Sequence, residues 1–348
     1  MKTMVTLLCV GVAVLALCLA GGAPAGGGPG EKAHVKAGDY TLSGPYTHKN
    51  ITVFLVHGAD TIKGKKFLTL QEALKKGVVI VYETGDVQKL TIENKSAGEY
   101  VYVQWGEIVK GGKQDRVIRY DLVLKPKSGK VPLASFCVEH GRWTGRGNEA
   151  VTNFESSGSA LATKELKLAT KKSGSQQKVW SGVAKVQNDL ARNVGGSVKG
   201  GESPSSLQLT LENKKVQAAA AAYVKQLAPI VEGKEDVVGF AFAINGEVNS
   251  ADVYASGALF RKLWPKLIEA SAIEAIAAYE KGKAFEAATA EDVKACLLDA
   301  DKARAVEEDI APHIRMRTRE TAEMILFETE STDGEPAVVH RGYVNKEE

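Results

Sequence analysis

RVIRYDLVLKPKSGKVPLASFCVEH, residues 116–140, is the stretch from which the fold class follows. Between positions 118 and 124, large apolar or aromatic side chains stand at every second position, which is the period of a half-buried strand. A turn rich in Pro, Ser and Gly comes next, and a second alternating segment returns. We expect a β-hairpin in which Leu124 pairs with Val131.

The expected hairpin brings two polar motifs to one end of the sheet. In this register Arg116 faces Glu139, and opposite charges across two strands stabilise their pairing. A slip by one residue would place Val138 or His140 opposite Arg116 instead. In either case the GGKQDR motif, which ends at Arg116, meets the CVEHGRW motif that contains Glu139.

The rest of the chain divides into a strand-rich and a helix-rich half. Before position 125 the pattern is mainly of short strands, with one or two helical turns from Leu70 to Lys76 that Thr69 caps. Beyond position 156 helices dominate, around one hairpin that turns at Asn245-Gly246. We therefore expect an α+β fold, with a β-rich N-terminal half packed with a helix-rich C-terminal half that contains a further β-hairpin.

The expected elements follow from local periodicity and turn residues. Strands are expected at residues 51–56, 78–83, 87–93, 100–104, 237–244, 248–255, 324–328 and 336–344. Helices are expected at residues 177–192, 214–227 and 291–308. In the helical region 256–279, Pro265 suits the first turn of a helix, so we expect one helix to end near Trp264 and another to begin at Pro265. Residues 156–174 and 195–206 are expected to be exposed loops.

The N-terminus has the composition of a targeting segment. Lys2 precedes an apolar run from Val5 to Ala20, and only Gly, Ala and Pro follow as far as Gly30. The run is shorter than the roughly 20 residues that span a bilayer, so export with cleavage is preferred over a membrane anchor. A lipid anchor on Cys18 is a further alternative. We expect an export signal at 1–25, a flexible linker at 26–37, a single domain at 38–345, and a secreted or periplasmic mature protein.

Composition excludes several classes of protein. Of the 348 residues, 44% are hydrophobic and 25% are charged, which is ordinary for a globular chain and excludes a disordered one. The net charge of +3 is spread without aromatic interleaving, so we expect no nucleic-acid partner. No later segment is apolar for long enough to span a membrane. The sequence leaves open the oligomeric state and whether Cys137 pairs with Cys296.

Common catalytic signatures are absent from the sequence. It contains no G-x-S-x-G elbow, no P-loop, no G-x-G-x-x-G, no C-x-x-C and no H-E-x-x-H. No histidine lies within four residues of another, so the sequence offers no local two-histidine metal site. The sequence therefore indicates neither a reaction nor a cofactor, and it leaves open whether the protein is an enzyme.

The polar motifs nevertheless offer the chemistry of an anion site. The candidate general acids or bases are Glu107, Asp115 and Glu139. The candidate ligand-binding residues are Lys113, Gln114, Arg116, His140, Arg142 and Trp143; the arginines offer a fork for phosphate or carboxylate, and the indole offers a stacking surface. Cys137 is expected to pack inside the sheet rather than to act as a nucleophile. The alternative is that both motifs are structural and only hold the sheet together.

Three segments together resemble the ARPP-1 family domain, which is associated with ADP-ribosylglycohydrolases and rhodanese-like phosphatases: GGKQDR (111–116), CVEHGRW (137–143) and LWPKL (263–267). AFAING (241–246) and Asp252-Val253-Tyr254 fit as well, and the resemblance covers roughly residues 38–280. The resemblance implies a function connected with ADP-ribose, nucleotides or phosphate groups, and no reaction is established for the family.

Two functions remain as expectations from the sequence. The first is an exported domain that binds or processes an anionic small molecule at the two motifs. The second is a non-enzymatic exported module that binds a protein or cell-envelope partner, with the motifs as internal struts.

Overall fold

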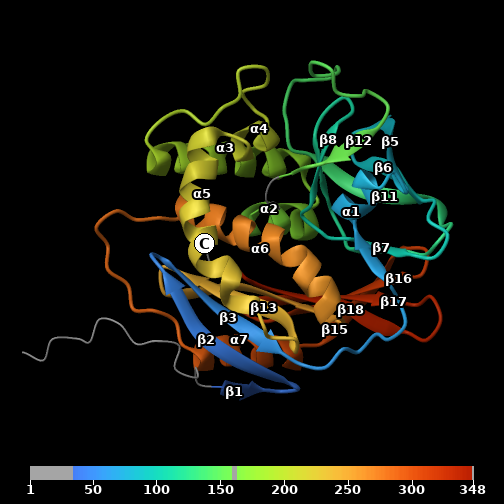
Figure 1. The fold of residues 1–348 in the computed structure, drawn as a ribbon. Coiled ribbons are helices and arrows are strands. Elements are labelled where there is room, and N and C mark those ends of the chain that lie inside the picture. Colours follow the sequence, from blue (N-terminus) through green and yellow to red (C-terminus); the bar gives the residue numbers. More distant parts are fainter. Residues whose placement is uncertain (1–33, 159–162, 347–348) are drawn as a thin grey trace, which may run out of the picture. The chain divides into compact units, whose positions relative to one another are not determined.

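The computed structural model describes residues 34–158 and 163–346. The expected export signal lies outside these residues, as does most of the expected linker. The described residues belong to one compact unit. Strands dominate its N-terminal part, helices follow, and further strands close the chain (Figure 1). The expected α+β fold class is confirmed.

A nine-stranded antiparallel sheet joins the two ends of the described chain. β3 pairs with β13, and β14 pairs with β18, so early and late strands share main-chain hydrogen bonds. Across the sheet the strands are β1 (His34–Ala37), β2 (Tyr40–His48), β3 (Ile51–His57), β13 (Val237–Ile244), β14 (Glu247–Tyr254), β18 (Ala337–Asn345), β17 (Met324–Ser331), β16 (Ile314–Glu320) and β15 (Ala305–Ala311).

Two smaller sheets carry the polar motifs. The first has the order β10 (Leu122–Leu124), β7 (Tyr100–Val103) and β4 (Phe67–Thr69). The second has the order β12 (Phe154–Ser156), β8 (Ile108–Gly111), β9 (Arg116–Ile118), β11 (Gly129–Cys137), β6 (Lys89–Asn94) and β5 (Val79–Asp86). The GGKQDR motif links β8 to β9, and the CVEHGRW motif begins at the end of β11.

The expected hairpin between residues 116 and 140 is wrong in its pairing. β9 and β10 lie in different sheets, so the first expected strand is broken in two. β11 pairs with β9 in a register that sets Cys137, not Glu139, opposite Arg116. Val131 pairs with Ile92 of β6 rather than with β10.

The break between β9 and β10 has a physical cause at Asp121. Its Oδ1 accepts the main-chain N–H of Trp105 at 2.9 Å and the hydroxyl of Tyr102 at 2.9 Å. These bonds, and the bonds of Asp121 to the large sheet described below, prevent residues 116–124 from forming one continuous strand. Alternation alone does not reveal that one polar residue in the pattern is bound elsewhere.

Several helices form as their sequences predict. α1 (Leu70–Lys75) begins at Thr69, whose hydroxyl accepts the N–H of Glu72 while the Glu72 carboxylate accepts the N–H of Thr69. α5 (Lys214–Leu227) buries the expected stripe of one face. The remaining helices are α2 (Lys164–Leu168), a π-helical turn (Ala169–Ser173), α3 (Gln176–Val194), α4 (Leu207–Leu211), a 3-10 turn (Ala228–Val231), α6 (Gly257–Ala277) and α7 (Ala290–Lys302).

Three local expectations are wrong. α6 runs unbroken through Pro265. The expected loop at 156–174 contains α2 and the π-helical turn. The expected helix at 291–308 ends at Lys302, and β15 begins at Ala305. In each case tertiary packing overrides local preference. A proline inside a helix costs about 3 kcal/mol, which the burial of α6 on two sides offsets.

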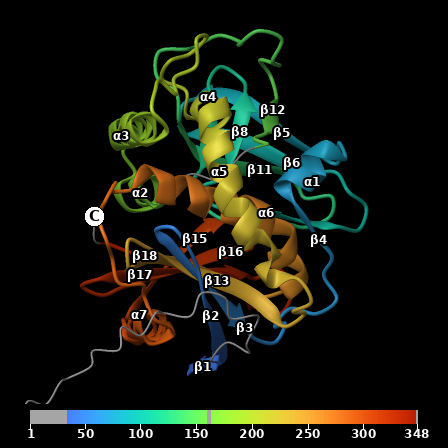
Figure 2. The ribbon, with the colours of Figure 1, turned by 60° about the vertical axis from the view of Figure 1, so that its left-hand side comes forward.

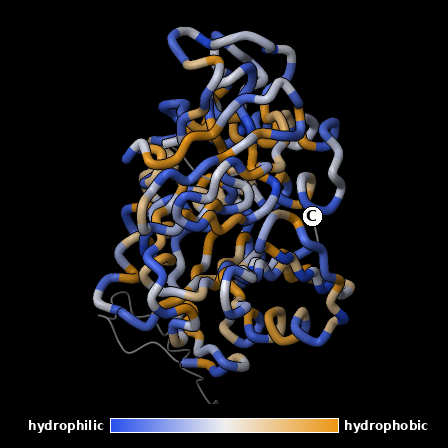
Figure 3. Tube along the Cα trace, turned by 90° about the vertical axis from the view of Figure 1, so that its right-hand side faces the viewer, coloured by the Kyte–Doolittle hydropathy of each residue, from blue (hydrophilic) through white to orange (hydrophobic). Residues whose placement is uncertain are grey.

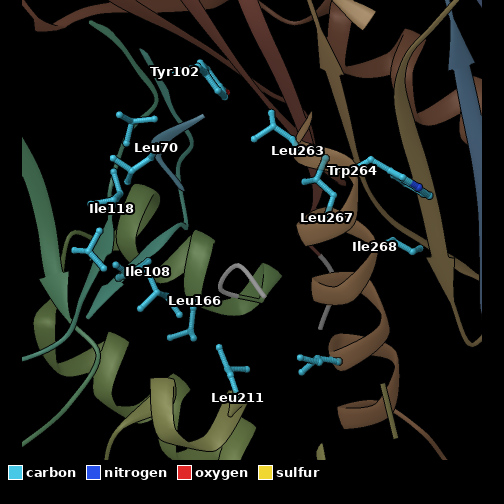
Figure 4. Packing of buried hydrophobic residues seen from close by; sticks show 14 of the residues in the cluster. Leu70, Tyr102, Ile108, Ile118, Leu166, Leu211, Leu263, Trp264, Leu267 and Ile268 are labelled. Carbon is cyan, nitrogen blue, oxygen red and sulfur yellow. The ribbon is translucent and has the colours of Figure 1, made fainter. Parts of the chain in front are cut away.

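α6 packs on one face of the nine-stranded sheet, and α7 lies on the other (Figures 1 and 2). In α6, Leu263 and Leu267 point toward the small sheet that contains Ile108, whereas Trp264 points toward the nine-stranded sheet (Figure 4). The Trp264 ring packs edge-on against Phe240 at 5.3 Å. Apolar segments gather inside the unit, and its peripheral loops are mostly hydrophilic (Figure 3).

Candidate functional site

The GGKQDR and CVEHGRW motifs come together and bury two carboxylates side by side. Asp115 and Glu139 are both fully buried. The main-chain N–H of Asp115 donates to Oε2 of Glu139 at 3.2 Å, and the N–H of Gly111 donates to Oδ1 of Asp115 at 3.1 Å. Asp115 comes just before β9 and Glu139 just after β11, so the pairing of these two strands positions both acids.

Two arginines neutralise these carboxylates. Arg146 donates through Nη1 to Oδ2 of Asp115 at 2.9 Å, and Nη2 of Arg142 lies 2.8 Å from Oε2 of Glu139. Each arginine also lies 3.6 Å from the other carboxylate. The four side chains form a charge-balanced network, which is what buried carboxylates require.

The network moves the pKa values of its two acids in opposite directions. Burial raises the pKa of Asp115, and the hydrogen bond to Arg146 only partly opposes this rise. Burial also acts to raise the pKa of Glu139, but the hydrogen bonds from Arg142, Ser203 and the main chain of Asp115, together with the charge of Arg142, outweigh burial and lower that pKa. Since both carboxylates are enclosed and bonded to arginine, the geometry gives them a positioning role rather than that of an exposed acid or base.

Arg116 does not meet Glu139. It is fully buried, donates through Nη1 to the main-chain oxygen of Gln114 at 2.7 Å, and lies 3.5 Å from a carboxylate oxygen of Glu83. The Gln114 side chain donates to the main-chain oxygen of Glu139 at 3.1 Å. Gln114 therefore braces the motif from inside.

The part of the motifs that faces solvent is aromatic and cationic. Trp143 is 43% exposed. The Nζ of Lys113 lies 5.4 Å from the centre of the Trp143 ring, and the Cζ of Arg116 lies 5.9 Å from it. His140 is exposed, and its ring packs edge-on against Trp180 at 4.4 Å. Lys113, His140, Arg142 and Trp143, with Arg116 beneath, are called the motif surface below.

The Gly111-Gly112 turn that presents Lys113 depends on both glycines. Gly111 has φ +113 and Gly112 has φ +56, a region that side chains disfavour. A Cβ at Gly112 would overlap the ring of Phe154 and approach Glu83 to 2.9 Å. The turn therefore has no room for a side chain.

Replacing Gly112 by alanine is expected to lower the free energy of unfolding by about 2–3 kcal/mol, because strain and overpacking combine. Chemical denaturation measures this loss. Gly98→Ala is the matched control, since no atom lies within 4 Å of a Cβ there and its φ is not left-handed. Equal stability of the two variants would contradict the expectation.

Glu107 lies apart from the other candidates. Its Oε1 accepts from Nζ of Lys266 in α6 at 2.6 Å, and Lys266 is also 3.5 Å from the hydroxyl of Ser156. This buried pair joins the small sheet to α6 and brings the LWPKL segment to the Trp-Gly-Glu turn. Glu107 is thus not part of the motif surface.

Cys137 is a packing residue, as expected. It is buried, and burial raises the pKa of its thiol to about 11, so it is not a ready nucleophile. Cys137 and Cys296 are both free thiols in the structure. These two cysteines therefore do not form a disulfide with each other.

Arg146 is the important residue of this region that sequence reasoning missed. It bonds Asp115, and it also bonds Glu149 at 2.8 Å and the hydroxyl of Ser206 at 3.4 Å. A signal was present: Gly141-Arg142 is repeated as Gly145-Arg146 four residues later. Such a repeat places two guanidinium groups in one loop.

A second buried network was also missed. His340 of β18 contacts Asp121 through Nδ1 at 3.2 Å and Asp252 of β14 through Nε2 at 3.0 Å. Asp121 also accepts the hydroxyl of Thr329 in β17 at 2.8 Å. All four residues are buried. The network ties the small sheets to the large one, and its members are too distant in sequence for any local pattern to reveal it.

Comparison with known proteins gives one finding. The family model of the ARG and Rhodanese-Phosphatase-superfamily-associated Protein domain, ARPP-1, matches residues 39–344. No curated protein and no solved structure matches the chain. Among residues 34–158 and 163–346, no helix has both the length and the apolar character to cross a membrane, and no three His, Cys, Asp or Glu side chains are grouped to hold a metal ion.

Proposed function

Since the chain belongs to the ARPP-1 family, we propose that it is an exported domain that binds an anionic small molecule, related to a nucleotide or ADP-ribose, at the motif surface. The observation that carries the proposal is the position of Trp143, which is partly exposed and has Lys113 and Arg116 beside its ring. A base or sugar would stack on the indole while the cations hold phosphate or carboxylate.

Unused donors support this assignment. The Nε atoms of Arg116 and Arg142 are buried and have no hydrogen-bond partner among the described residues. Buried donors without acceptors are rare in native proteins, and they often mark places where water or a ligand binds. An oxyanion that reached beneath Trp143 would supply the missing acceptor.

The same geometry favours binding over acid–base catalysis. Asp115 and Glu139 are engaged by Arg142 and Arg146, so they hold the loop that carries Trp143. This part of the site fits the alternative hypothesis, in which the motifs are struts. The proposal therefore assigns the two acids to structure, and it assigns ligand binding to Trp143, the partly exposed Lys113 and the unused Nε donors of Arg116 and Arg142.

Ligand titration tests the proposal. ADP-ribose, nucleotides and sugar phosphates are expected to raise the melting temperature of the wild type by mass action. Lys113→Ala and Trp143→Ala are each expected to weaken affinity about tenfold, a loss of about 1.4 kcal/mol. Both side chains reach solvent, so both variants are expected to fold.

Lys49→Ala is the matched control, because Lys49 also lies over an aromatic ring, that of Tyr223 at 4.8 Å, outside the motif surface. Its affinity is expected to equal that of the wild type. If none of these compounds shifts the melting temperature, or if the two motif variants bind as tightly as the control, the proposal is rejected.

A further inference from the structure

A second unsatisfied cation lies in the interior, outside the motif surface. Lys171 is buried, and its Nζ has no hydrogen-bond or ion-pair partner in the described part of the chain. It belongs to the π-helical turn Ala169–Ser173, and such turns recur at functional sites. Because a buried ammonium without an acceptor is costly, this group requires an acceptor that the described side chains do not supply.

Aromatic rings enclose the Lys171 ammonium. Its Nζ lies 3.6 Å from the centre of the Trp105 ring and 4.3 Å from that of Phe327. Lys167, one helical turn earlier, lies 5.3 Å from the same Trp105 ring. Aromatic faces attract a cation, but they do not replace the hydrogen-bond acceptors of an ammonium. Two lysines thus converge on one buried indole.

The neighbouring carboxylates are already occupied. Asp121 accepts from the Tyr102 hydroxyl, the main-chain N–H of Trp105, the Thr329 hydroxyl and His340. Four donors fill the lone-pair sites of a carboxylate. Burial lowers the pKa of Lys171 to about 8, and the charge of Asp121 only partly opposes this. The attraction of Asp121 therefore does not give Lys171 a bonded partner.

Glu274, an acid whose charge interacts with that of Lys167, is also engaged. It accepts from the Asn249 side chain at 3.2 Å and from the main-chain N–H of Lys164 at 3.3 Å. Burial raises the pKa of Glu274, with the nearby lysines opposing the rise.

One further buried donor of this cluster lacks an acceptor. The indole Nε1 of Trp105 has no hydrogen-bond partner among the described residues, and Trp105 is almost completely buried. The cluster therefore holds two unused donors, Nζ of Lys171 and Nε1 of Trp105, which match a group that accepts hydrogen bonds.

We propose that Lys171, with Lys167 and the indole N–H of Trp105, binds the oxyanion group of a small ligand inside the unit. The group is a carboxylate or a phosphate, which share the acceptor oxygens and negative charge that the cluster lacks. This site is separate from the motif surface, since it is built on the π-helical turn, α2 and the turn after β7.

Anion titration of the full-length Lys113→Ala variant tests the interior site with the partly exposed cation of the motif surface removed. Sodium phosphate and sodium malonate are each compared with sodium chloride at constant ionic strength, by thermal shift and calorimetry. Phosphate or malonate is expected to raise the melting temperature more than chloride does. The anion that does so shows whether the site takes a phosphate or a carboxylate. Adding Lys171→Met is expected to weaken that binding at least tenfold.

Lys172→Met is the control, because the neighbouring Lys172 side chain is half exposed and pairs with Glu320 at 2.7 Å. Its affinity is expected to be unchanged. If no oxyanion stabilises the protein more than chloride, or if Lys171→Met binds it as well as Lys172→Met does, buried water explains the cluster and the proposal fails. If Lys171→Met does not fold, Trp105→Phe keeps the ring and removes the N–H, and undiminished binding would then overturn the proposal.

Discussion

Replacing Asp121 by alanine is expected to lower the free energy of unfolding by about 3–5 kcal/mol, the range for breaking a buried charge pair. The variant loses the shared acceptor for Tyr102, Trp105 and Thr329. It also leaves His340 with only one of its two carboxylates. Each donor that loses its acceptor stays buried, and the cost of burying it without a hydrogen bond is the main part of the lost stability.

The pH dependence of stability carries a signature of the same network. Burial acts to lower the pKa of His340, but the charges and bonds of Asp121 and Asp252 outweigh it and raise that pKa. Burial acts to raise the pKa of Asp121, but the charge and hydrogen bond of His340 are the main causes that lower it. The pKa of Asp252 is also lowered, because Lys167 and His340 together outweigh burial.

The directions of these pKa shifts define the pH range in which the network stabilises the protein. A raised folded pKa means that the His340 contribution is complete below about pH 6.5 and is lost as the pH rises through the folded value. Lowered folded pKa values mean that the aspartate contributions are complete above about pH 4 and are lost as the pH falls through the folded values. The network therefore stabilises most between about pH 4 and 6.5.

Chemical denaturation at several pH values measures both effects. Asp121→Ala is expected to lose most stability inside this window. Asp39→Ala is the control, since Asp39 is exposed, and a change within about 0.5 kcal/mol is expected there. A loss below about 1 kcal/mol in Asp121→Ala, or the same loss at pH 9 as at pH 5, would contradict the role given to the network.

Replacing Arg146 by methionine is expected to cost a similar amount, about 3–5 kcal/mol. Methionine keeps much of the apolar stem but removes the guanidinium that neutralises Asp115. Asp115 stays buried with Arg142 at 3.6 Å as its remaining cation. The variant is also expected to release the loop that carries Trp143, because Arg146 bonds Glu149 within that loop.

Arg192→Met separates this effect from the general loss of an arginine. Arg192 pairs with Asp189 at 2.8 Å but is 66% exposed, and exposed pairs contribute about 0–1 kcal/mol. Asp115→Asn in the Arg146→Met background is expected to recover part of the lost stability, because it removes the stranded charge. Equal losses in Arg146→Met and Arg192→Met would show that the buried network does not stabilise the fold.

Local features of the fold were predictable from the sequence. The α5 helix has the bounds and the buried stripe that its periodicity indicates. At Asn245-Gly246 both residues have positive φ, at 53° and 91°, as the hairpin turn requires. In these segments the preferences of neighbouring residues agree with the packing, so short-range reasoning suffices.

For the site, the sequence correctly indicated that the two motifs meet, because strand ends bring them together. It did not indicate the partners within the site. The expected pair of Arg116 with Glu139 is replaced by Arg142 and Arg146 on Glu139, since the register differs from the predicted one by two residues. Register depends on contacts with every neighbouring strand, and β11 also pairs with β6.

The sequence by itself determined the α+β class, most strands and helices, and the family resemblance later shown by the match over residues 39–344, because these depend on periodicity and on contiguous motifs. Only the tertiary structure decided that Asp121 bonds His340 instead of continuing a strand, that α6 continues through Pro265, and that the Lys171 ammonium has no hydrogen-bond acceptor among the described residues. Those outcomes depend on charges and side chains that are distant in sequence and compete inside a dry interior, where one ion pair or one buried helix face outweighs local preference.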